Sequence, residues 1–415
     1  MARGLYPRAL DRVVADELLP AFPAVMLVGP RGSGKSTSMT GLADTVLDLS
    51  LPGVRLAARE DPDAILSSSV GTVLIDEWQE APEILGAVKR AIDQDRENTP
   101  GRFIVTGSVR ATLQAATWPG TGRLIRIRMY GLTQAELAGD STYNPVDALF
   151  AATPPVFGHS GQTRRDYLEM ITAGRFPSLI GLEGRSRARW LQAYVDQLVD
   201  RDAQQVASQS STPAKLRAVL TSCAARTGQE LNKSATAKDA GVDFRTADRA
   251  VGLLEDLSII LRVPAWHAQR LKRLTQAPKV VLSDPGMAAY LLGIDADSLG
   301  RAPGLIGQMF ETFVIAELAT HIETASEETG LFHVRDRDGK EVDVVLERHG
   351  RIVALEVKSS TRVDRSDARG LLWLRDRIGE SFHHGAVLYS GTLPFQIDDR
   401  IWALPISSLW RKPES

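Results

Sequence analysis

Residues 29–36 read Gly-Pro-Arg-Gly-Ser-Gly-Lys-Ser and directly follow the apolar run 24–28. They match the pattern G-x-x-x-x-G-K-[ST], set between a predicted strand and a predicted helix. Glycines let successive backbone N–H groups face one anion, Lys35 can reach the β- and γ-phosphates, and the Ser36 hydroxyl can bind Mg²⁺. The stretch therefore predicts a P-loop for ATP and Mg²⁺. The predicted contact residues are Gly29, Pro30, Arg31, Gly32, Ser33, Gly34, Lys35, Ser36 and Thr37.

Residues 72–77, Thr-Val-Leu-Ile-Asp-Glu, predict a buried strand that ends in two carboxylates. We expect this strand to lie beside strand 24–28. Asp76 would then hold Mg²⁺ through water, and Glu77 would act as the general base on the attacking water, with Lys35 as the other catalytic group. A solvated strand end is the alternative for this pattern taken alone. The preceding P-loop favours the functional interpretation.

Residues 103–108, Phe-Ile-Val-Thr-Gly-Ser, predict a third strand tipped by small polar residues. We expect Thr106 or Ser108 near the γ-phosphate, where a hydroxyl can orient the attacking water. The alternative is a strand that merely ends in a tight turn. Arg110, just beyond, is either an arginine finger or an ordinary exposed loop arginine.

The composition is that of a folded protein with balanced charge. The 415 residues carry 49 Lys and Arg against 51 Asp and Glu, a net charge of −2. This balance excludes a strongly basic nucleic-acid binder but leaves a local basic face open. The single cysteine, Cys223, excludes an intramolecular disulfide. No signal peptide and no apolar run of about 18 residues is present, so we expect a cytoplasmic protein without membrane contact.

The pattern along the chain predicts an ATPase domain, a helical lid or linker, a winged-helix-like domain and a last α/β domain. Their expected bounds are 1–140, 141–210, 211–275 and 276–415. Residues 234–273 predict a helix-turn-helix, with Asp243 as the N-cap of its second helix. This part can contact DNA, or it can serve packing alone. The side chains expected at DNA are Arg245, Thr246, Arg249, Arg270, Lys272 and Arg273.

Two C-terminal strands carry charged residues at neighbouring ends. Glu341-Val342-Asp343 opens the first strand, and Glu356-Val357-Lys358 closes the second. A hairpin around 348–351 would bring Asp343 near Glu356. Two carboxylates can bind Mg²⁺, and Lys358 can stabilise hydroxide or the developing charge, which is the chemistry of phosphodiester hydrolysis. The alternative is a hairpin with cross-strand salt bridges and no metal.

The motifs together resemble a widespread bacterial and archaeal family of AAA-type ATPases that carry a C-terminal domain of unknown function. They are the P-loop, residues 74–82 (Leu-Ile-Asp-Glu-Trp-Gln-Glu-Ala-Pro) and residues 105–108 (Val-Thr-Gly-Ser). Residues 174–177, Gly-Arg-Phe-Pro, resemble the Gly-Gly-x-Pro segment of that family, with Arg175 in place of the second glycine. The similarity covers essentially the whole chain.

The C-terminal strands resemble the PD-(D/E)xK restriction-endonuclease-like core, with Asp343 followed by Glu356-x-Lys358. In the predicted helix 307–318, Glu311 lies on the inward face, where a carboxylate needs a partner or a metal, and Glu317 lies on another part of the wheel. The resemblance implies that an acid from this helix joins the metal site, and Glu311 matches it. The expected fold class is therefore α/β. It combines an AAA-like parallel-sheet P-loop domain, a helical and winged-helix middle and a nuclease-like α/β domain.

Two functions are consistent with these motifs. The first is a Mg²⁺-dependent ATPase coupled to a nuclease-like domain that acts on DNA, with Glu311, Asp343 and Glu356 as metal ligands. Asp343, Glu356 and Lys358 would be its catalytic residues. The second is a nucleotide-switched protein that binds DNA or another protein without cleaving. The intact acids and lysine favour the first, and the sequence leaves a homo-oligomer open.

Overall fold

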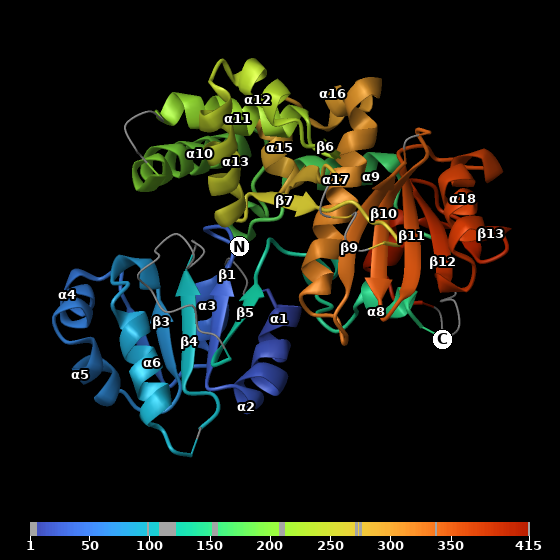
Figure 1. The fold of residues 1–415 in the computed structure, drawn as a ribbon. Helices are drawn as coiled ribbons and strands as arrows, with labels where there is room; N and C mark the ends of the chain where they lie inside the picture. Colours follow the sequence, from blue (N-terminus) through green and yellow to red (C-terminus); the bar gives the residue numbers. More distant parts are fainter. Residues whose placement is uncertain are drawn as a thin grey trace. The chain divides into compact units, whose positions relative to one another are not determined.

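The computed structural model divides the chain into two compact units. The N-terminal unit comprises Met1–Leu132 with the short segments Gly139–Ser141 and Asp256–Ser258, and the C-terminal unit comprises the remainder. Figure 1 labels many of the elements of both units. The structure describes residues 6–97, 99–107, 122–151, 157–206, 212–269, 273, 276–336 and 338–413, with only the backbone of 201–206.

A five-stranded parallel sheet forms the centre of the N-terminal unit. Its strands are β1 (Ala24–Val28), β2 (Thr45–Asp48), β3 (Val73–Asp76), β4 (Phe103–Gly107) and β5 (Leu124–Arg128). Their order in the sheet is β2-β3-β4-β1-β5 (Figure 1). The expectation that the strand ending in Asp76 lies beside strand 24–28 is therefore wrong. Strand β4 lies between them and pairs with both.

Helices cover both faces of this sheet because its strands are apolar on both sides. They are α1 (Ala9–Arg12), η1 (Val13–Leu18), α2 (Leu19–Ala21), α3 (Lys35–Thr40), α4 (Pro52–Glu60), α5 (Pro62–Ser67) and α6 (Ile84–Gln94). All five residues of β1 are buried, and successive side chains point to opposite faces. Met26 and Val28 belong to one core with α4, α5 and α6. Val25 and Leu27 belong to the other core with α1, η1 and α3.

Helices dominate the first part of the C-terminal unit. They are α7 (Gln134–Leu137), α8 (Pro145–Leu149), α9 (Arg164–Ala173), α10 (Gly184–Val206), α11 (Pro213–Ala225), α12 (Lys233–Ala240), α13 (Phe244–Asp256), α15 (Pro285–Leu291) and α16 (Ala296–Gly300). Side-chain oxygens of Thr163, Thr212 and Asn232 accept backbone hydrogen bonds at the N-termini of α9, α11 and α12. Such caps fix where each helix begins. Within the described residues, no helix combines the length and apolar character that crossing a membrane requires.

A small antiparallel sheet lies next to α11, α12 and α13. Its strands are β6 (Gln229–Glu230), β7 (Ile260–Val263) and β8 (Lys279–Leu282), in the order β6-β8-β7. The four residues of β8 are all buried, although the first of them is a lysine. Strand β8 thus places the charged side chain of Lys279 inside the protein.

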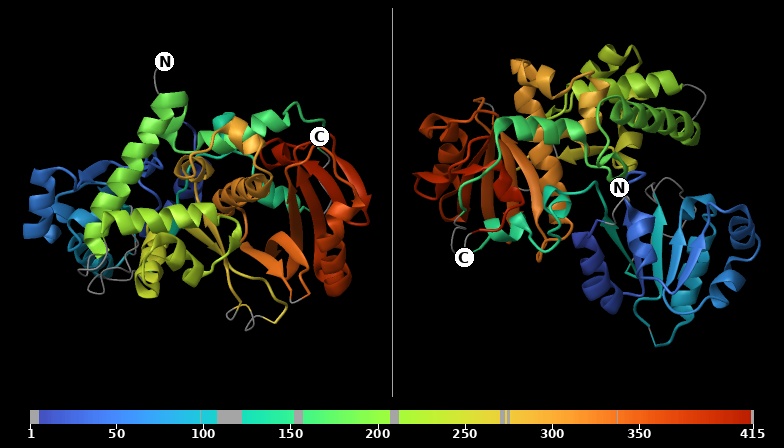
Figure 2. Two further views of the ribbon diagram at one scale, coloured as in Figure 1. Left: turned by 90° about the horizontal axis from the view of Figure 1, so that it is seen from above. Right: turned by 180° about the vertical axis from the view of Figure 1, so that it is seen from behind.

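A six-stranded mixed sheet forms the last part of the chain, with α17 (Pro303–Ile322) and α18 (Arg369–Ile378) on its two faces (Figures 1 and 2). Its strands are β9 (Gly330–Arg335), β10 (Glu341–Arg348), β11 (Arg351–Lys358), β12 (Phe382–Tyr389), β13 (Phe395–Asp398) and β14 (Ile401–Pro405), in the order β13-β14-β12-β11-β10-β9. Leu371 and Leu374 of α18 pack on the core of one face. Helix α17 is buried almost throughout from Ile306 to His321, so its charged side chains need partners inside the protein.

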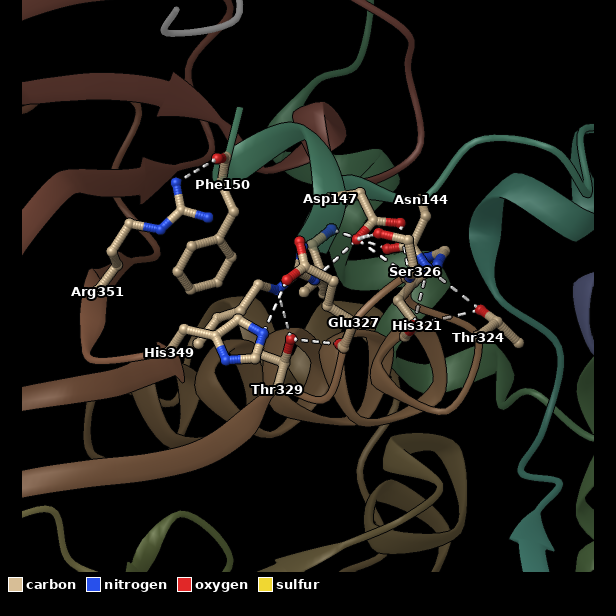
Figure 3. Close-up of polar contacts among 12 residues, drawn as sticks. Asn144, Asp147, Phe150, His321, Thr324, Ser326, Glu327, Thr329, His349 and Arg351 are labelled. Atoms are coloured by element: carbon tan, nitrogen blue, oxygen red, sulfur yellow. Dashed lines mark hydrogen bonds and ion pairs between the residues drawn. The ribbon is translucent and has the colours of Figure 1, made fainter. Parts of the chain in front are cut away.

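A polar network fixes residues 144–150 to the C-terminal sheet (Figure 3). Asp147 of α8 accepts hydrogen bonds from the N–H and hydroxyl of Ser326, at 3.0 and 2.8 Å. The buried guanidinium of Arg348 donates to the same carboxylate at 2.7 Å. It also lies over the ring of Phe150, 4.7 Å from the ring centroid. The start of the predicted lid or linker is therefore packed onto strand β10.

Candidate functional site

The P-loop connects β1 to α3 and is shaped by its glycines. A side chain at Gly29 is excluded, because its Cβ would lie 2.1 Å from the carbonyl oxygen of Met129. Gly34 precedes α3 with a left-handed φ of 101°, a conformation that glycine adopts without the steric cost of a Cβ atom. The turn thereby directs the first N–H groups of α3 toward the space beyond the C-terminal end of β1. Phosphates bind at this position in P-loops.

Lys35 lies at the centre of this loop and is only 6% exposed. Its ammonium group donates to the carbonyl oxygens of Gly29 and Pro30, both at 2.9 Å. Burial lowers the pKa of Lys35 to about 8, although the charges of Glu77 and Asp76 act in the opposite direction. The ammonium is thus held by weak neutral acceptors that phosphate oxygens can replace.

One further atom of the loop fits an anionic ligand. The hydroxyl of Ser33 is buried and has no hydrogen-bond partner among the described residues. Arg31, Gly32, Ser36 and Thr37 surround it in sequence, and all four are at least partly exposed. A buried hydroxyl without a partner is costly unless a ligand accepts its hydrogen bond. The residues of the loop therefore fit the phosphates of a nucleotide.

Asp76 ends β3 next to the P-loop helix. Its Oδ1 accepts hydrogen bonds from the hydroxyl of Ser36 at 2.8 Å and from the N–H of Glu77 at 3.1 Å. The same oxygen accepts the hydroxyl of Thr106. Carboxylate and hydroxyl oxygens are the ligands that Mg²⁺ prefers, so Ser36 and Asp76 fit this ion. Thr106, one of the two residues expected near the γ-phosphate, uses its hydroxyl here to hold Asp76.

Glu77 directly follows β3 in an unusual backbone conformation. Its φ of 54° lies in the left-handed region, which costs a residue with a Cβ atom about 1–2 kcal/mol. Its carboxylate accepts the side-chain amide of Gln79 in the short helix η2 (Trp78–Glu80). Trp78 itself is 1% exposed and anchors this turn in the core. The turn therefore gives Glu77 a fixed position beside the Asp76 carboxylate.

Arg8 links the P-loop to the segment that follows β5. The sequence motifs did not predict this contact. It is 4% exposed and donates to the carbonyl oxygens of Ser33 at 2.8 Å and Tyr130 at 2.9 Å. No pattern around Arg8 signals this role, because both acceptors are backbone atoms distant in sequence. The predicted residues Ser108 and Arg110 lie outside the residues that the structure describes.

The C-terminal hairpin brings the predicted acids together. Strands β10 and β11 pair in the register Val344 with Leu355, and the two-residue turn is His349-Gly350. This register places Asp343 opposite Glu356. Asp343 accepts the N–H of Val357 at 2.9 Å, and Glu356 accepts the ammonium of Lys358 at 2.7 Å. Burial raises the pKa of Glu356 to about 8, with a further contribution from the charge of Asp343.

Lys279 of β8 lies within this acidic site and was not predicted. Its ammonium is 2.6 Å from Glu311 Oε1, 3.0 Å from Glu341 Oε1 and 3.7 Å from Asp343 Oδ1. Burial alone would lower the pKa of Lys279, but the charges of the three acids raise it above its ordinary value. In the described part of the chain, no three His, Cys, Asp or Glu side chains are arranged to hold a metal ion. In this arrangement the predicted ligands do not fit Mg²⁺.

Glu317, the other acid of α17, belongs to a separate buried network. It is fully buried, and its carboxylate lies 3.2 Å from the Nε of Arg175. It also accepts the N–H of Gln134 at 3.0 Å. Arg175 therefore supplies the counter-charge for Glu317. Only Glu311 of the two acids lies beside Asp343.

The helix-turn-helix presents fewer cations than expected. Asp243 caps α13 as predicted, and it accepts both the N–H of Thr246 at 3.0 Å and its hydroxyl at 2.7 Å. Thr246 is thereby buried and does not project toward a groove. Arg273 donates to Glu347 at 2.6 Å and is not a free phosphate contact either. Arg245 and Arg249 are exposed. The remaining two cations, Arg270 and Lys272, lie outside the described residues.

Three parts of the chain match known protein families. Residues 21–138 match an AAA domain, residues 164–298 match a domain of unknown function, DUF8612, and residues 306–409 match another, DUF4143. The first match agrees with the P-loop and the parallel sheet. Residues 21–138 of the N-terminal unit are therefore similar to AAA domains in sequence.

The chain is also similar to uncharacterized proteins of Mycobacterium tuberculosis and Mycobacterium bovis. Each is 27% identical over 397 residues, which covers 93% of this chain and 81% of the relative. Among solved structures, the Walker-type ATPase of Pyrococcus abyssi is 14% identical. That alignment covers 70% of this chain and 100% of the other, with a TM-score of 0.41.

Proposed function

We propose that the N-terminal unit binds and hydrolyses ATP with Mg²⁺ at the P-loop. The observation that carries this proposal is the 2.8 Å contact between Ser36 and Asp76, which joins the two expected Mg²⁺ ligands from separate motifs. The match of residues 21–138 to an AAA domain supports it. Mg²⁺ neutralises charge on the β- and γ-phosphates in this class of reaction.

Each residue of the site then has a defined task. Lys35 exchanges its carbonyl acceptors for phosphate oxygens, and the N–H groups at the start of α3 bind the same phosphates. Ser36 and Asp76 hold the ion, and Thr106 keeps Asp76 in place. Glu77 accepts the proton of the attacking water. The buried Ser33 hydroxyl gains a phosphate acceptor.

Phosphate release by the full chain with ATP and Mg²⁺ tests this proposal. Glu77→Gln keeps the side-chain shape but removes the base, so turnover should fall by about 100-fold or more while ATP binding is retained. The matched control is Glu60→Gln at the end of α4, an exposed glutamate outside the site, which should behave as wild type. Unchanged turnover in Glu77→Gln would overturn the assignment of the base.

For the C-terminal unit we propose binding without cleavage, the second of the two functions that the sequence allows. The observation that favours it is Lys279, whose ammonium lies 2.6 Å from Glu311 and 3.7 Å from Asp343, two of the three acids that a nuclease would use for its metal. Among the described residues from α11 to β8, the order of one helix, one strand, two helices and two strands resembles that of a winged helix. This order and the exposed Arg245 and Arg249 support DNA as the partner.

Incubation with supercoiled plasmid in Mg²⁺ or Mn²⁺, with and without ATP, separates binding from cleavage. We expect retarded plasmid in a gel but no nicking, and weaker retardation for the double variant Arg245→Ala/Arg249→Ala. Cleavage by wild type that disappears in Asp343→Ala would instead establish the metal-dependent nuclease with Asp343, Glu356 and Lys358 as its residues. Whether or not the plasmid is cleaved, we expect the wild-type protein to hydrolyse ATP, because the P-loop residues belong to the N-terminal unit.

A further inference from the structure

We propose that the ammonium group of Lys279 is the resident cation of the C-terminal acidic site and excludes a divalent metal from it. The cluster consists of Lys279 with Glu311, Glu341 and Asp343. These side chains come from β8, α17 and β10, so tertiary packing alone brings them together. The proposal rests on their contacts and is independent of ATP hydrolysis.

The distances define where the cation lies. The ammonium hydrogen-bonds to Glu311 at 2.6 Å and contacts Glu341 at 3.0 Å, with Asp343 at 3.7 Å. Lys279 is 1% exposed, so its charge has no access to bulk water. A divalent ion bound by the same oxygens would lie about 2.0–2.6 Å from each of them. That position overlaps the ammonium, so the two cations cannot be present together.

Some of the remaining oxygens have partners, whereas the buried Oε2 of Glu356 has none among the described residues. The second oxygen of Asp343 accepts the Val357 N–H, and Glu356 is paired with Lys358. On the other side of Glu311 lies the backbone of Gly228. It is so close that a Cβ atom added to this glycine would be 3.3 Å from Glu311 Oε2. The ammonium of Lys279 is thus enclosed beside Glu311, while Glu341 reaches it from a side chain that is 39% exposed. Lys279 and Lys358 together supply counter-charge to these carboxylates from within the chain.

The proposal predicts that removing the charge of Lys279 creates a metal site. Removing the ammonium leaves three carboxylates without their counter-charge. Their oxygens are not arranged for a metal ion while the lysine is present, but they are the ligands that hard divalent cations draw together when they bind. Lys279→Met keeps most of the side-chain stem while it removes the charge. We therefore expect Lys279→Met to create a divalent-cation site that the wild-type chain lacks.

Calorimetric titration of the full chain with Mn²⁺ tests this expectation. Lys279→Met should bind one more Mn²⁺ per chain than wild type, and the added site should disappear in Lys279→Met/Asp343→Asn. Lys279→Arg, which retains a cation, should add no site. Mn²⁺ bound elsewhere, including at the P-loop, is common to all four proteins and cancels in the comparison.

A second comparison decides the proposal even where Lys279→Met does not fold. Wild type and Asp343→Asn should bind Mn²⁺ with equal stoichiometry and affinity. A wild-type Mn²⁺ site that Asp343→Asn removes would overturn the proposal, and so would a folded Lys279→Met that gains no site. Phosphate release from ATP is measured on the same samples, so a failure of the ATPase assignment is recognised separately.

Discussion

Thr106→Val tests whether the P-loop site is built in advance to hold a cation. Thr106 is fully buried, and its hydroxyl donates to the Asp76 oxygen that also accepts from Ser36 and the Glu77 N–H. Valine preserves the branched shape of threonine, so the substitution removes chiefly one hydrogen bond. The variant therefore isolates the contribution of a single donor to the orientation of Asp76.

The size of the effect follows from the kind of bond that is lost. A hydrogen bond to a charged group contributes about 1.5–3 kcal/mol. When Ser36 turns its hydroxyl toward Mg²⁺, Thr106 and the Glu77 N–H are the donors that continue to hold Asp76. Because about 1.4 kcal/mol corresponds to a factor of ten, we expect the Mg²⁺ requirement of turnover to rise by about 10- to 100-fold.

The assay is phosphate release at saturating ATP across a Mg²⁺ titration. The half-saturating Mg²⁺ concentration should rise in Thr106→Val and stay near the wild-type value in Thr106→Ser, which restores the hydroxyl. Circular dichroism establishes that both variants are folded. A folded Thr106→Val with an unchanged Mg²⁺ requirement would refute the reasoning and leave the hydroxyl with a structural role only.

Three further predictions concern packing and protonation. Arg348→Met should lower the free energy of unfolding of the C-terminal unit by about 1.5–3 kcal/mol, the contribution of a hydrogen bond to a charged group, and by less in an Asp147→Asn background, as a urea double-mutant cycle would measure. Gly107→Ala should change tryptophan fluorescence and reduce ATP turnover, because a Cβ there would lie 2.5 Å from Trp78 Nε1; identical spectra and turnover would count against it. Burial lowers the pKa of His333 to about 4, with the charge of a neighbouring lysine adding to the effect. Below its ordinary pKa of about 6.5, only the unfolded chain takes up this proton, so stability is lost as pH falls. The advantage of wild type over His333→Gln should therefore shrink by about 2 kcal/mol between pH 7 and pH 5, and a constant difference would contradict this.

Local chemistry explains which features could be predicted from the sequence. The P-loop is predictable because Gly29, Gly34 and Lys35 act through adjacent backbone atoms, and their spacing is itself the requirement. The C-terminal hairpin is predictable because its strands flank a short turn at His349-Gly350 and their side chains alternate. In both places, residues close in sequence are the residues that interact.

Features that depend on distant pairing were missed or wrongly assigned. The order of parallel strands is set by crossovers, so nothing near Asp76 indicates that β4 lies between β3 and β1. Arg8 binds carbonyl oxygens, which every residue carries, and so leaves no pattern in sequence. Lys279 did leave a signal, a lysine at the start of the apolar run Val280-Val281-Leu282. A charge in a buried strand needs a counter-charge. Which residues supply that counter-charge depends on the packing of α17 and β10.

The two acidic sites of the chain differ in what surrounds their aspartates. Asp76 accepts hydrogen bonds from two hydroxyls and one N–H, neutral donors that orient the carboxylate. The nearby positive charge belongs to Lys35, whose ammonium is bonded to the carbonyls of Gly29 and Pro30. Asp343 lies near the ammonium of Lys279, which does cancel charge in its site. A divalent ion gains most where negative charge is oriented and uncompensated. Neutral donors around Asp76 therefore prepare a cation site that a ligand completes, whereas the lysine beside Asp343 completes its site from within the chain.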